Sequence, residues 1–156
     1  MTFKRWLYRG GRPNRLAKII NTGWAAIHAL GLFPTYLVTL EVVGRMSGEI
    51  VRFPLAMTTL NDTRYLVSML GANSNWVKNV RAAGGNAVLH HGKREAVWLV
   101  EVDAGLRAPI LKAFLQIAPG ARPHIAARKD APIAEFEAIA SKYPVFRVEH
   151  RRAKVS

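Results

Sequence analysis

Segments rich in apolar, β-branched and aromatic residues alternate along this chain with short runs of turn-forming residues. Six segments have this strand-like pattern: 35–43, 50–60, 64–70, 86–91, 95–102 and 144–150. A glycine-containing break joins the first two, Asn61 to Thr63 the second and third, and Gly92 with Lys93 the fourth and fifth. Such closely spaced segments predict a mainly antiparallel sheet of about six strands, curled into a barrel.

Four other stretches have apolar residues at helical spacing. They cover residues 15–30, 75–83, 103–117 and 132–143. Pro109 indicates either a kink or the true first turn of the third stretch, and Pro132 suits the first turn of the fourth. Asp103 is a candidate cap. The expected fold class is therefore α+β, mainly β, with helices packed outside the barrel.

Charge narrows the choice of partner. The chain has 23 Lys and Arg against 10 Asp and Glu, a formal net charge of +13. This bias favours nucleic acid, anionic lipid or an anionic cofactor. The absence of cysteine excludes disulfides, a thiolate nucleophile and Cys-containing metal sites.

Residues 1–34 form a basic amphipathic helical segment in this interpretation, ahead of a barrel domain at 35–156. The segment has no acidic residue before Glu41, and polar residues interrupt its apolar run, so neither a spanning helix nor a signal peptide is expected. It either packs on the domain with its basic face in water or contacts anionic lipid. We expect a cytoplasmic protein, with peripheral contact at the inner face of the membrane as the second alternative.

The turn Gly-Arg-Met-Ser-Gly at residues 44–48 is the first candidate anion site. Arg45 offers a planar fork of donors, Ser47 offers a hydroxyl, and the flanking glycines let backbone amides approach a ligand. Arg52 on the returning strand reinforces the site if it points the same way. The alternative is a hairpin tip that is simply solvated.

Residues 68–85 are the second candidate, because a strand ends at a glycine and a polar loop and then enters a helix. The free amides and the dipole at such a helix start favour an anion. Asn73 or Ser74 alternatively caps the helix, and Trp76 is alternatively a core residue that lies one turn from Val80.

Three consecutive stretches together resemble a known family. They are GRMSGEIVRFPL (44–55), SMLGANSNWVKNVRAAGG (68–85) and NAVLHHGKREAVWLVEV (86–102). They are similar to the deazaflavin-dependent oxidoreductases of actinobacteria, nitroreductases and quinone reductases with a split β-barrel fold. The resemblance is firmest from Tyr36 to Val102. Members bind coenzyme F420, a flavin analogue with a phosphate and an oligoglutamate tail, which suits the charge of +13.

The resemblance implies an F420H2-dependent oxidoreductase that passes a hydride from the reduced deazaflavin to a quinone-like or other conjugated acceptor. The hydride belongs to the coenzyme, so no catalytic side chain is implied. The implied coenzyme-binding residues are Arg45, Ser47, Gly48 and Arg52 at the phosphate and tail, Pro54 beside the ring, and Ser68, Gly71, Trp76 and Asn79 along the ring and its linker.

Met46 and Met69 are departures inside this site, since family members often have basic residues there. They favour the alternative, a non-catalytic or FMN-, haem-, tetrapyrrole- or lipid-binding protein on the same barrel. The tyrosine-rich lid of the nitroreductases is replaced by residues 118–132, so activity on nitroimidazoles is not expected. His124 in this loop is a weak candidate for substrate contact.

Two other functions are disfavoured. Adjacent His90 and His91 point to opposite faces of a strand, so no metal site is expected there. Nucleic-acid binding rests on charge alone, without a reading helix or interleaved aromatic residues. Whether the chain is a monomer or a homodimer is left open.

Overall fold

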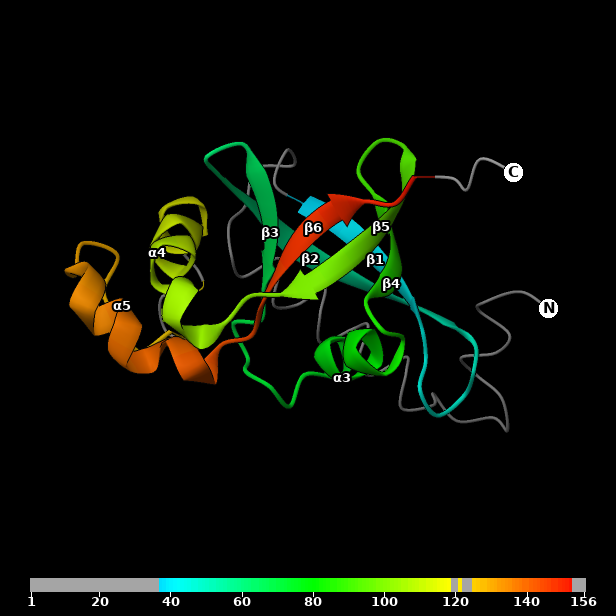
Figure 1. Ribbon diagram of the computed structural model, residues 1–156, viewed down its shortest axis with the longest axis horizontal. Helices are drawn as coiled ribbons and strands as arrows, with labels where there is room; N and C mark the ends of the chain where they lie inside the picture. The colour runs from blue at the N-terminus through cyan, green and yellow to red at the C-terminus, as the bar shows by residue number, and fades with distance from the viewer. Residues whose placement is uncertain (1–36, 119–120, 122–124, 153–156) are drawn as a thin grey trace.

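Six strands make up most of the protein, as Figure 1 shows for this computed structural model, which describes residues 37–118, 121 and 125–152. The strands are β1 (Leu37–Val43), β2 (Ile50–Leu60), β3 (Thr63–Val67), β4 (Asn86–His90), β5 (Arg94–Glu101) and β6 (Val145–His150). The helical elements are α3 (Asn75–Ala82), η3 (Ala104–Leu106), α4 (Ala108–Ile117), α5 (Ile133–Ile139) and η5 (Ala140–Lys142). The expected α+β, mainly β class is confirmed.

The sheet closes into a barrel with the strand order β1-β2-β3-β6-β5-β4, and every neighbouring pair is antiparallel. Strand β2 is shared between two neighbours: residues 50–56 pair with β1 and residues 57–60 pair with β3. Pro54 lies in the half that pairs with β1 alone among the described strands. Proline is tolerated in such a half-edge because no second neighbour needs its missing N–H.

Alternating side chains fill the barrel. In β1, Val38, Leu40 and Val42 point inward, and their counterparts in β2 include Val51 and Phe53. Helix α3 lies across one end of the barrel (Figure 1) and its buried Trp76, Val77 and Val80 join the same apolar cluster. Trp76 packs on Phe146 with ring centroids 5.5 Å apart.

A second apolar layer lies outside the barrel, where α4 packs against β2 and β3 and α5 packs on α4 (Figure 1). Phe114 and Phe136 are its largest fully buried side chains. Arg107 ties this layer to the sheet: its guanidinium donates to the carbonyls of Val102, Ala140 and Tyr143. Burial lowers the pKa of Arg107, and Glu101 opposes that shift.

Several predicted boundaries were wrong. The third strand ends at Val67 and not at residue 70, because Ser68 and Gly71 turn the chain there; the fourth ends at His90 and not at residue 91. The stretch 103–117 is divided into η3 and α4, with Pro109 in the first turn of α4. Pro132 occupies the N-cap of α5 and not its first turn, and Asp103 makes no side-chain cap bond.

The basic segment 1–34 lies outside the described residues, and so does His124. Within the described part of the chain, no helix has the length and apolar character needed to cross a membrane.

Candidate functional site

The tip of the β1–β2 hairpin, residues 44–49, is a tight turn. Gly44 donates to the carbonyl of Glu49 over 2.7 Å, and Gly48 donates back to the carbonyl of Gly44 over 2.9 Å. Gly48 has a φ of 71°, a conformation that glycine adopts readily. A Cβ on Gly44 would lie 2.7 Å from the Ser47 hydroxyl, so the turn requires a glycine there unless Ser47 moves.

Arg45 fastens this tip to helix α3. Its Nη1 donates to Oδ1 of Asn79 over 2.8 Å and its Nη2 to Oδ1 of Asn75 over 3.2 Å. The backbone N–H of Arg45 reaches the same Asn79 oxygen over 3.2 Å. Asn79 is buried, whereas Arg45 is exposed. The arginine is therefore held in one place while its outer edge faces solvent.

The turn after β3 forms a second polar group at the start of α3. The buried Ser68 hydroxyl donates to the carbonyl of Gly71 over 2.7 Å and lies 3.0 Å from the Ser74 hydroxyl. Gly71 has a φ of 92°. Ser74 occupies the N-cap of α3, but its side chain makes no cap bond, so neither of the two predicted capping residues caps the helix with its side chain. The turn therefore leads the chain into α3, while the Ser74 side chain accepts no hydrogen bond from the first backbone N–H groups of the helix.

The remaining predicted residues lie in different surroundings. Trp76 belongs to the barrel core, and the half-buried Met69 packs on the outer apolar layer. Met46 is 79% exposed at the tip. Thus Arg45 and Asn79 are in contact, as are Ser68 and Gly71, and the structure does not bring Met46 and Met69 into one apolar cluster.

Arg52 points to the outer face of the barrel, where it meets the buried carboxylate of Glu41. Its Nε lies 2.8 Å from Glu41, whose other neighbours are Arg94 Nη2 and His90 Nε2, both at 2.9 Å. Burial raises the pKa of Glu41, but hydrogen bonds from Arg94 and Arg52, together with the nearby His90, outweigh it and lower the pKa to about 2. Arg52 is therefore committed in part to Glu41.

The far end of the barrel has its own ion cluster. Arg64 binds both carboxylate oxygens of Glu95, at 2.7 and 2.9 Å, and His91 and His150 lie 2.7 and 2.9 Å from them. The bidentate hydrogen bonds from Arg64 hold the pKa of Glu95 well below its usual range. His90 and His91 thus serve different carboxylates, as their strand positions predict, and the described residues contain no cluster suited to a metal ion.

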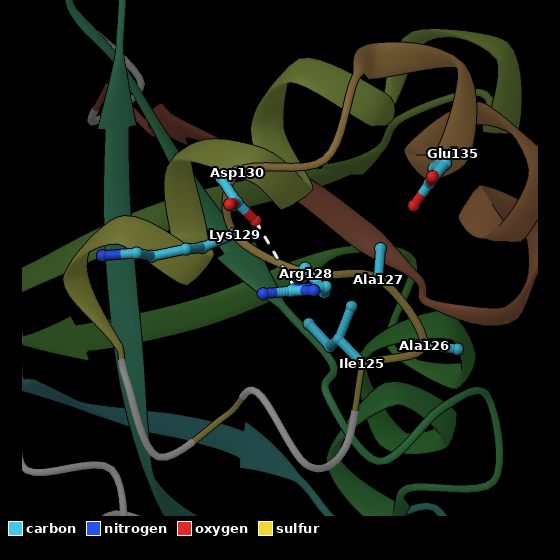
Figure 2. Close-up of a pocket in the computed structure, with 7 residues that line it drawn as sticks. All are labelled: Ile125, Ala126, Ala127, Arg128, Lys129, Asp130 and Glu135. Atoms are coloured by element: carbon cyan, nitrogen blue, oxygen red, sulfur yellow. Dashed lines mark ion pairs between the residues drawn. The ribbon is translucent and has the colours of Figure 1, made fainter.

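A separate open pocket of about 530 Å³ lies beside α5 (Figure 2). Its lining residues are Ile125, Ala126, Ala127, Arg128, Lys129, Asp130 and Glu135. Arg128 and Asp130 are paired at 3.7 Å, and both side chains are largely exposed. None of the predicted coenzyme-binding residues lines it, and the hairpin tip lies at the other end of the molecule from α5 (Figure 1).

Sequence reasoning missed two contributors. Asn75 was placed only as a helix start, although it holds Arg45. Glu41 appears in the sequence analysis only as the first acidic residue of the chain; the signal that could have identified the cluster is its place opposite Arg52 in the predicted hairpin.

No model of a known protein family matches the chain, and no curated protein matches it. Solved structures do. A putative pyridoxamine 5'-phosphate oxidase from Listeria innocua matches with a TM-score of 0.53 and 9% identity, over 86% of this chain and 94% of that one. A haem-binding protein from Mycobacterium smegmatis matches with a TM-score of 0.52 and 14% identity, over 81% of this chain and 51% of that one.

An F420-H2 dependent reductase matches with a TM-score of 0.49 and 22% identity, over 73% of this chain and 94% of that one. The chain spans about half the length of some of the structures that it resembles, the haem-binding protein among them. At these identities the likeness concerns architecture alone. The described chain therefore has the split β-barrel fold, a closed barrel of six antiparallel strands with flanking helices.

Proposed function

We propose that this protein binds coenzyme F420 at the junction of the hairpin tip with α3 and acts as an F420H2-dependent reductase of a quinone-like or other conjugated acceptor. The observation that carries the proposal is the held Arg45. Of the five N–H groups of a guanidinium, the amides of Asn75 and Asn79 take up two. The rest are free for a phosphate or carboxylate at the solvent edge.

The neighbouring groups fit the same anion. Ser47 accepts a hydrogen bond from the Glu49 amide over 3.2 Å and keeps its hydroxyl proton for a ligand. The Ser74 side chain leaves the first amides of α3 without a side-chain cap, and no acidic residue lies in the first turn. Phosphate and tail would thus meet Arg45, Ser47 and Gly48, and the ring would lie toward Pro54 and the Ser68–Gly71 turn.

Reduced F420, when bound, supplies a hydride to the acceptor. The chain itself would contribute binding and orientation. Trp76 and Asn79 are both buried, so they would support the site without touching the coenzyme. Trp76 packs in the barrel and Asn79 holds Arg45. Met46 and Met69 add no charge, so the anion contacts rest mainly on Arg45.

The test is a titration of the full chain with F420, followed by quenching of tryptophan fluorescence, with FMN and haem in parallel. We expect saturable F420 binding that weakens with added salt, and a 10- to 100-fold loss, on the order of 1.5–3 kcal/mol, in Arg45→Gln. Arg128→Gln is the control, because Arg128 is an equally charged, exposed residue that lines the separate pocket beside α5 (Figure 2). Thermal unfolding of each variant separates a lost contact from a loosened hairpin. Unchanged F420 affinity in a folded Arg45→Gln protein would refute the assignment.

A second candidate is a non-catalytic holder of FMN, haem or another apolar guest. Its support is the methionines that replace cations and the shared fold with the haem-binding protein and the putative oxidase. Saturable uptake of FMN or haem without F420 binding would favour it.

A further inference from the structure

The hairpin tip presents apolar side chains to solvent. Val43 and Ile50 are directly opposite each other across β1 and β2, and they are 50% and 47% exposed. Met46, between them at the turn, is 79% exposed. Val43 and Ile50 lie on the same face of the hairpin, and together with Met46 at the turn they make up what we call the apolar tip.

The apolar tip is held rigidly away from the barrel. The two backbone bonds between Gly44, Gly48 and Glu49 close the turn, and Arg45 fastens it to Asn79. Figure 1 shows the hairpin extending past α3, beyond the end of the barrel. Because the backbone is already ordered, placing these side chains in another medium requires little further loss of conformational entropy.

Basic side chains surround the apolar tip. Arg45, Arg52 and Lys78 of α3 are all exposed, and Glu49 is the one acidic residue of the turn. The whole chain carries +13. Apolar side chains at a projection with basic residues behind them match the boundary of an anionic bilayer, where apolar groups enter the acyl region and cations meet the headgroups.

We propose that the apolar tip inserts into an anionic lipid surface and docks the barrel there with its α3 end toward the membrane. Two other occupants fit less well. A second copy would meet three apolar side chains with the same basic surround, far short of the roughly 800 Å² per partner of a stable interface. The segment at residues 1–34 is itself basic, so its charge opposes these cations. The proposal does not depend on F420.

The absence of cysteine allows a direct test with the full chain. Met46→Cys is labelled with the environment-sensitive fluorophore NBD and mixed with vesicles of phosphatidylglycerol and phosphatidylcholine, or of phosphatidylcholine alone. Leu106→Cys is the matched control, because Leu106 is apolar and 66% exposed in η3, away from the tip. We expect a blue shift and quenching by spin-labelled lipid at position 46 with the anionic vesicles, and neither at position 106.

A second variant tests insertion of the apolar tip without a fluorescent label. Met46→Asp should raise the vesicle concentration needed for half-maximal cosedimentation by about tenfold, since an apolar group is lost and a like charge faces the lipid. Leu106→Asp should leave it unchanged. If Met46→Asp cosediments with the vesicles as well as the parent does, the proposal is overturned. An NBD group at position 46 that is already shielded from iodide before vesicles are added would also overturn it. The latter would assign the tip to the N-terminal segment or to a second copy, which sedimentation velocity would distinguish.

Discussion

At the scale of single residues, the most constrained polar group is Glu41. It is 3% exposed on the outer face of β1, with two arginines and a histidine within 2.9 Å. A buried carboxylate is tolerated only when its lone pairs are met, and removal of one member of such a network weakens the others. Glu41 therefore organises Arg52 on β2 and Arg94 on β5 across three strands, next to the candidate site.

Glu41→Gln should destabilise the protein at pH 7 by about 1–3 kcal/mol, because Arg52 and Arg94, both about half-exposed, each lose their ion pair with Glu41. The folded-state pKa of about 2 is below the ordinary 4.5, so this stabilisation is present above about pH 4.5 and is lost as the pH falls toward 2. Urea unfolding of parent and variant at pH 7 and pH 3 should show a smaller gap at pH 3. Glu137→Gln, an exposed change on α5, serves as the control. An equal gap at both values would contradict this account.

At the scale of elements, α3 connects the candidate site with the core. One face of this helix places Trp76, Val77 and Val80 in the barrel, while Asn75 and Asn79 hold the hairpin. Its position depends on the turn into β4, where Gly85 donates to the carbonyl of Val80 and accepts from Leu99. The geometry of Arg45 is thus set by how α3 ends.

Gly85→Ala should destabilise the protein by more than about 2 kcal/mol, because a Cβ there would lie 2.5 Å from the Leu99 carbonyl oxygen and the φ is 86°. The matched control is Gly84→Ala, whose φ is 64° but whose Cβ would meet nothing within 4 Å. We expect about 1 kcal/mol there, from the left-handed conformation alone. Denaturant unfolding measures both, and equal losses would show that the close approach to Leu99 is relieved without strain.

At the scale of the whole molecule, one sheet separates two apolar layers. β2 gives Phe53 to the barrel interior and Ala56 to the outer layer, and β6 likewise divides Phe146 from Val145. Both layers therefore depend on the same strands, which makes independent unfolding of either unfavourable.

Phe114→Ala, in the outer layer, should lower the free energy of unfolding by about 3–5 kcal/mol. Because the two layers share strands, the barrel should unfold at the same lower denaturant concentration as the helices. Far-ultraviolet circular dichroism and tryptophan fluorescence should then give coincident denaturation curves, as in the parent. A variant that loses helix signal at lower denaturant while its tryptophan signal persists would show that α4 and α5 unfold separately.

Local pattern in the sequence was sufficient to predict the class of the fold, the number of strands, their order along the chain and the turn at residues 44–48. Period-two alternation and glycine breaks are properties of neighbouring residues, so they can be recognised without the tertiary structure. The pairing of β1 with β4 and of β3 with β6 required the tertiary structure, since strand closure depends on contacts distant in the chain. The same applies at the candidate site. The sequence was enough to single out Arg45 and Ser47 as residue types suited to an anion. It did not show that Asn75 and Asn79 hold Arg45 or that Glu41 engages Arg52. These contacts, and the place of Trp76 in the core, depend on how α3 and β1 pack.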